Sequence, residues 1–189
     1  MYKLFCLLFI IVTISCQSKE HDIAQQVLDL NSKACEIINM NPDSALILLD
    51  SAIKLDSKFS TAYFNEVIIY CNKAQYTKAI ECNKNGLKSK PDLAESIMFM
   101  GLLYDKTKDT IRANIEYSKA IQLFNLRLKV SNKNSKANKI NRAISLILLG
   151  NEKGREDLNK LLIENPDDSI LKDLQKFGKA EYIAEVLPN

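Results

Sequence analysis

Small residues recur in this chain at a fixed interval. Each of the following residues is separated from the next by 34 positions: Ala45, Ala79 and Ala113. Seven residues after each of them stands another small residue, in the order Ala52, Gly86 and Ala120. A double column of this period is the signature of a repeat built from one supersecondary unit. Because bulky side chains would hold two packed backbones apart, these positions and Gly101 predict close contacts between neighbouring elements.

Apolar residues around these positions recur at spacings of three and four, which predicts amphipathic helices. The first runs over 23–40, and Asn41 and Pro42 are an N-cap and an N1 proline for the next. Asp92 and Glu95 give a capping-box pattern at the start of a later helix. After Ala120 the phase breaks, which predicts a helix extended by about two turns, a loop over 132–135, and two further helices over 137–149 and 151–165.

The repeats resemble the tetratricopeptide repeat (TPR) family, whose unit has 34 residues. The third unit carries the spaced pattern of that family in the order Ile97, Met100, Gly101, Tyr104, Ala113 and Tyr117. The resemblance implies an all-α fold, a right-handed superhelical array of antiparallel helix pairs (TPR-like α-solenoid) with a C-terminal capping helix. It divides a domain over 23–187 into repeats at about 26–59, 60–93, 94–134 and 135–168, with a cap over 168–187. In the fourth repeat, Gly154 takes the position of Ala79.

In this family the first helices of successive repeats line a concave face on which peptides commonly bind. The positions that the resemblance assigns to this groove are mostly apolar: Phe64, Ile68, Cys71, Asn72, Met98, Leu102, Asp105 and Lys106. An apolar groove fits an amphipathic helix or an extended apolar peptide. The alternative is that the chain's own N-terminal helix, its own tail or a second subunit covers the groove.

The N-terminus has the features of a bacterial lipoprotein. The apolar run from Leu4 to Ile14 is too short for a transmembrane helix and fits a signal peptide over 1–15. Small residues precede Cys16, as in a lipobox, which implies cleavage before Cys16 and its acylation, with 16–22 as a polar tether. The tether resembles those of Bacteroidetes surface lipoproteins and predicts an outer-membrane location, on the periplasmic or surface face. The alternatives are an ordinary secreted protein and an uncleaved anchor.

The composition argues against several other classes of protein. The net charge of +3 includes no long basic run, which disfavours nucleic-acid binding. The single histidine, His21, lies in the tether, and no Cys/His spacing predicts a metal site or a cofactor. No nucleophile–base pair or phosphate loop is visible, so an enzyme is not expected. Cys71 and Cys82 are interpreted either as small buried residues or as a disulfide pair.

Two functional hypotheses follow. The first is a non-enzymatic protein–protein interaction module, a lipid-anchored TPR scaffold at the bacterial envelope that binds a partner protein or peptide through its apolar concave groove. The alternative is a peptide- or small-molecule-binding lipoprotein that serves uptake or sensing.

Overall fold

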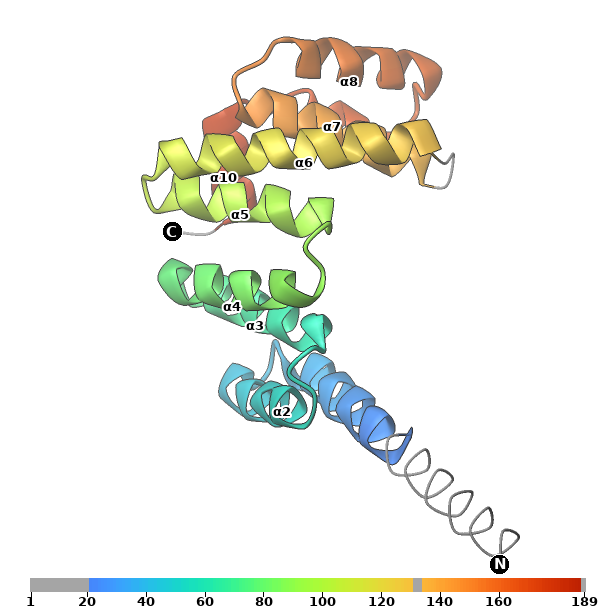
Figure 1. Cartoon of the computed structure of the whole chain (residues 1–189). Helices are drawn as coiled ribbons and strands as arrows, with labels where there is room; N and C mark the ends of the chain where they lie inside the picture. Colours follow the sequence, from blue (N-terminus) through green and yellow to red (C-terminus); the bar gives the residue numbers. More distant parts are fainter. Residues whose placement is uncertain (1–20, 131–133, 188–189) are drawn as a thin grey trace, which may run out of the picture.

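The computed structural model describes residues 21–130 and 134–187, and within them the regular structure is helical, with no strand. The helices stack one after another along an extended array (Figure 1). Consecutive helices pack as antiparallel pairs, α3 with α4, α5 with α6 and α7 with α8. The predicted all-α, TPR-like α-solenoid is therefore confirmed.

A first helix passes through residues 21–37. The helices that follow it are α2 (Pro42–Leu55), α3 (Ser60–Asn72), α4 (Tyr76–Ser89), α5 (Ala94–Lys106), α6 (Thr110–Val130), α7 (Ser135–Leu148), α8 (Lys153–Glu164), α9 (Ser169–Leu174) and α10 (Lys179–Val186). As the sequence predicts, α6 is long, with 21 residues against 14 in α4. Seven added residues are two helical turns, and they account for the break in the repeat phase after Ala120.

The helix starts agree with the sequence in one case and differ in another. Asn41 caps α2, since its side chain accepts a hydrogen bond from the backbone N–H of Ser44 at 3.1 Å. The predicted capping box at Asp92 is wrong, because Leu93 is the N-cap of α5 and no side chain caps this helix. Glu95 instead pairs with Arg127 on the extension of α6, with 2.6 Å between the carboxylate and the guanidinium.

The small residues of the repeat lie inside the array. All five alanines of the column have no exposed surface: Ala45, Ala52, Ala79, Ala113 and Ala120. The two glycines make room for aromatic rings: a Cβ at Gly86 would come within 2.5 Å of the Phe64 ring, and one at Gly101 within 2.4 Å of the Tyr117 ring. At these two glycines, a ring of the paired helix therefore occupies the space that a side chain would take.

Gly154 is the position where two helix backbones do approach closely. A Cβ at this glycine on α8 would lie 2.4 Å from the carbonyl oxygen of Ala143 and 2.9 Å from the backbone nitrogen of Ile147, both on α7. Gly154 thus has, in the fourth repeat, the contact role that the sequence assigns to the small-residue column.

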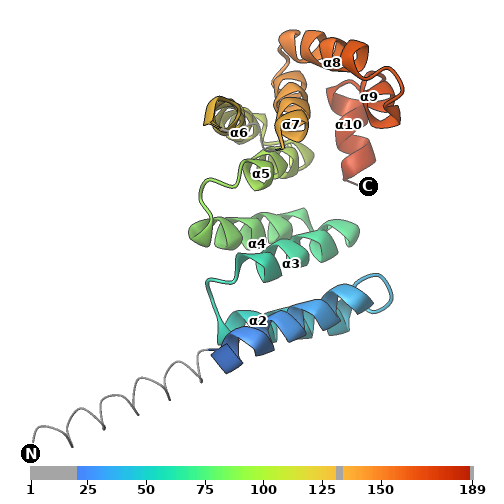
Figure 2. The ribbon, with the colours of Figure 1, turned by 90° about the vertical axis from the view of Figure 1, so that its right-hand side faces the viewer.

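The C-terminal segment departs from simple stacking. The helix α9 packs against α8, and its Leu171 is fully buried. The chain then turns back, and α10 lies beside α5 on the side away from α6 (Figures 1 and 2). The last helix therefore contacts a repeat that precedes it by about 80 residues, for example through the hydrogen bond from Lys106 to Leu187.

Candidate functional site

The eight predicted groove residues lie on α3 and α5, but they are not equally accessible. Ile68 is 49% exposed, Asn72 is exposed and Phe64 is half-buried. The following three, predicted to be exposed, are instead buried: Cys71, Met98 and Leu102. Their assignment to an open groove surface is therefore corrected.

The chain's own tail contributes to this burial where it lies on α5. Four residues at the C-terminus pack against the core cluster that contains Cys71, Met98 and Leu102, and they are Tyr182, Ile183, Val186 and Leu187. Leu187 itself has no exposed surface. Of the alternatives left open by the sequence, coverage by the tail is the one found here, over the part of the groove formed by α5.

The two remaining groove residues, Asp105 and Lys106, hold the polar side of this contact. Asp105 accepts a hydrogen bond from the Tyr117 hydroxyl at 2.8 Å and pairs with the Lys179 ammonium of α10 at 2.8 Å. Lys106 donates to the backbone carbonyl of Leu187 at 2.8 Å. Burial, together with the hydrogen bond to Asp105, raises the pKa of Tyr117, so this hydroxyl stays protonated and acts as a donor.

Next to the covered part, an open hollow of about 310 Å³ lies between α3 and α5. Its lining, hereafter the apolar hollow, consists of Phe64, Val67, Ile68, Asn83, Leu93, Glu95, Ser96 and Phe99. Only Phe64 and Ile68 were among the predicted groove residues. The spacing of three between Phe64 and Val67, and of four between Glu95 and Phe99, is the signal that would have found Val67 and Phe99.

The polar atoms at the floor and rim of the apolar hollow differ in how they are paired. At the floor, the Asn83 amide donates to the Ser96 carbonyl at 2.9 Å, and the Ser96 hydroxyl donates to the Asn83 side chain. At the rim, one oxygen of Glu95 pairs with Arg127, and the other is buried and has no hydrogen-bond partner within the described part of the chain.

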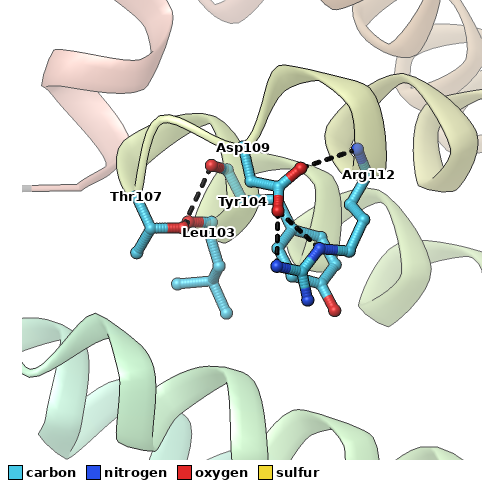
Figure 3. A network of polar contacts seen from close by, with 5 residues as sticks. All are labelled: Leu103, Tyr104, Thr107, Asp109 and Arg112. Atoms are coloured by element: carbon cyan, nitrogen blue, oxygen red, sulfur yellow. Dashed lines mark hydrogen bonds and ion pairs between the residues drawn. The ribbon is translucent and has the colours of Figure 1, made fainter.

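A second hollow, of about 460 Å³, lies over the loop that joins α5 to α6 and over α4. Figure 3 shows its polar network, in which Asp109 accepts from the backbone N–H and the guanidinium of Arg112. These bonds, the backbone one first, lower the pKa of Asp109. The Arg112 guanidinium lies 4.8 Å from the centre of the Tyr104 ring. The charges of Asp109 and Arg112 are thus paired with each other, and the network closes the turn between the two helices.

A third hollow, of about 570 Å³, lies between the start of α5, the end of α6 and the start of α7. Val130 and Asn134 line it and adjoin residues 131–133, which are outside the described residues. It is therefore not assigned as a site.

A buried acid lies between the first and second repeats. Glu66 on α3 is 6% exposed and accepts a hydrogen bond from the Cys82 thiol of α4 at 3.2 Å. The pKa of Glu66 is raised to about 7, mainly by burial and also by the neighbouring Asp50 on α2, although the Cys82 bond acts in the opposite direction. Burial and the neighbouring Glu66 also raise the pKa of Cys82, so this cysteine is a thiol and a poor nucleophile.

Other predicted features have the following outcomes. Cys71 and Cys82 are both free, and burial raises the pKa of Cys71 to about 11. Across residues 21–130 and 134–187, no group of His, Cys, Asp and Glu side chains is arranged to hold a metal ion. In the same residues, no helix combines the length and the apolar character needed to cross a bilayer. The predicted signal peptide and lipidated Cys16 lie outside the described residues.

Comparison with known proteins supports the fold. No protein-family model matches the chain, and no curated protein matches its sequence. The crystal structure of MamA matches with a TM-score of 0.53 and 16% identity, over 74% of this chain and 78% of that one. The structure of YrrB, described as a TPR protein with an unusual peptide-binding site, matches with a TM-score of 0.53 and 16% identity, over 89% and 88% of the two chains. The fold of the chain is thus TPR-like.

Proposed function

We propose that this protein is a non-enzymatic interaction module, a lipid-anchored TPR-like scaffold of the bacterial envelope that binds a protein or peptide partner. The observation that carries the proposal is the apolar hollow between α3 and α5. It lies on the helices that line the concave face, and Ile68, which lines it, is 49% exposed.

The chemistry of the apolar hollow fits a peptide side chain. Phe64, Ile68 and Phe99 offer apolar surface. A cavity of about 310 Å³ has room for one or two large side chains. Burying an aliphatic or aromatic side chain contributes about 1.5–3 kcal/mol, so a peptide with two such anchors would bind with useful affinity. The peptide-binding site attributed to YrrB gives this proposal a precedent on the same fold.

A pull-down from detergent-solubilised envelope tests the proposal. We expect wild-type protein to retain one abundant partner and Ile68→Asp to lose it, because the charge enters the apolar hollow. Ile111→Asp is the matched control, since Ile111 on α6 is 79% exposed and lies outside the apolar hollow. Equal retention by Ile68→Asp and Ile111→Asp would refute the apolar hollow as the binding site. Loss of a small bound molecule in place of a protein would favour the alternative of a ligand carrier for uptake or sensing.

The lipid anchor is a separate part of the proposal. It is supported by the apolar run before Cys16 and the small residues that precede this cysteine. Several acyl chains on one residue give stable anchoring, since each buried CH₂ contributes about 0.8 kcal/mol. We expect Cys16→Ser to move the protein from the membrane fraction to the soluble fraction. If the variant stays in the membrane fraction, Cys16 is not the anchor. An outer-membrane location, on the periplasmic or surface face, is part of this proposal.

A further inference from the structure

The last helix, α10, has one face that contacts the array and one face that does not. The contacting residues follow at i, i+3, i+4, i+7 and i+8, and they are Lys179, Tyr182, Ile183, Val186 and Leu187. The residues between them are exposed to solvent: Ala180, Glu181, Ala184 and Glu185. This is the pattern by which an amphipathic helix binds in a groove of another protein.

The surface beneath α10 has the matching parts of a helix-binding groove. Its floor is the apolar cluster of the concave face that includes Met98 and Leu102. At one end, Asp105 and the Tyr117 ring receive a cation: the Lys179 ammonium lies 2.8 Å from the carboxylate and 5.5 Å from the ring centre. The carboxylate is itself fixed by the Tyr117 hydroxyl and is only 5% exposed. The site therefore combines an apolar floor with a binding position for one basic side chain.

The attachment of α10 to this surface is slight compared with that of the other helices. It has eight residues, and none of them is fully buried. Arg155 of α8 anchors the preceding segment by donating to the carbonyls of Gln175 and Phe177, each at 3.1 Å, so Gly178 joins a fixed point to a short helix. An isolated helix of this length is unstable in water, so the helical form of α10 depends on its contact with α5.

We propose that α10 is an internal occupant of a helix-binding groove, and that the partner of this protein is an amphipathic helix that displaces it. The partner has the chemistry that α10 shows: one basic residue, followed by aromatic or aliphatic residues at the third, fourth, seventh and eighth positions after it. This inference rests on the proposed interaction function and defines the partner of the same concave face. Displacement also opens the part of the groove next to the apolar hollow.

Binding of a fluorescent peptide with the sequence of residues 178–187 to the full-length chain tests the inference. In wild-type protein α10 competes from within, at the high effective concentration of a tethered segment. The double variant Lys179→Asp/Tyr182→Ala weakens the contact of α10 with the groove and changes no residue of the groove itself. We expect it to bind the peptide at least tenfold more tightly than wild type in fluorescence anisotropy. Glu185→Ala, on the exposed face of α10, is the matched control and should bind as wild type does.

Further control measurements distinguish the possible outcomes. A peptide that carries Ile183→Asp and Val186→Asp should not bind the released chain, and equal binding of both peptides would overturn the proposal. Absence of tighter binding to a folded variant, verified by circular dichroism, would overturn it as well. If the double variant does not fold, Lys179→Asp alone gives the same comparison. A wild-type dimer that the double variant abolishes would identify the occupant as α10 of a second copy and overturn the partner assignment. Loss of partner capture by Ile68→Asp is measured independently, so the proposed function can survive the failure of this inference.

Discussion

Replacing the buried acid Glu66 by glutamine should stabilise the protein in neutral solution. In the folded chain the pKa of Glu66 is about 7, against an ordinary value of 4.5 for a glutamate. Between these two pH values the folded state holds a proton that the unfolded state has lost, so stability falls as the pH rises from about 4.5 to about 7 and then levels off. At 1.36 kcal/mol for each pH unit of difference, the full loss is at most about 3 kcal/mol.

Glutamine has the shape of the protonated acid and no charge to desolvate. Its side-chain oxygen can accept from the Cys82 thiol, and its amide can donate toward the Asp50 carboxylate. We therefore expect Glu66→Gln to exceed wild type by about 2–3 kcal/mol in free energy of unfolding at pH 8 and to equal it near pH 4.5. Glu81→Gln is the control, because Glu81 is exposed on α4.

The assay is urea unfolding followed by circular dichroism at 222 nm, at several pH values from 4.5 to 8 and constant ionic strength. The difference in free energy of unfolding between Glu66→Gln and wild type should increase as the pH rises. It should be absent for Glu81→Gln. A difference that stays flat across this range would refute the reasoning, because it would mean that the pKa of Glu66 is the same in the folded and unfolded states.

Three further changes test the packing of the array. Ala79→Leu should lower the free energy of unfolding by about 1–3 kcal/mol more than Ala24→Leu, since Ala79 is fully buried and Ala24 is exposed; equal melting temperatures would contradict this. Gly154→Ala should destabilise the protein in urea despite the better helix propensity of alanine, because the new Cβ meets the α7 backbone; a more stable variant would show that α7 and α8 separate freely. Asn83→Leu leaves the buried Ser96 hydroxyl unpaired and should cost about 1–3 kcal/mol in the same assay, so an unchanged midpoint would mean that this pair contributes nothing.

The candidate site could be predicted from the sequence only in part. The repeat phase places Phe64 and Ile68 on one face of their helix, because such faces follow from local spacing, and both residues line the apolar hollow. It fails for Met98 and Leu102, which are buried. A segment about 80 residues further along the chain packs against the cluster that contains them, and no local period encodes that contact. The same holds for Glu66, whose neighbours Asp50 and Cys82 come from two other helices.

The sequence by itself determined the all-α repeat architecture, because helical periodicity and a regular interval of small residues are local properties that survive in the primary structure. It also determined the extension of α6, since the phase shift counts the inserted residues. Only the tertiary structure decided which part of the concave face is open and which is covered by α10. The end of the chain could have capped the last repeat alone, and its return to α5 depends on the pairing of Lys179 with Asp105 and on the burial of Leu187. Such contacts between distant residues are decided by the packing of the whole chain.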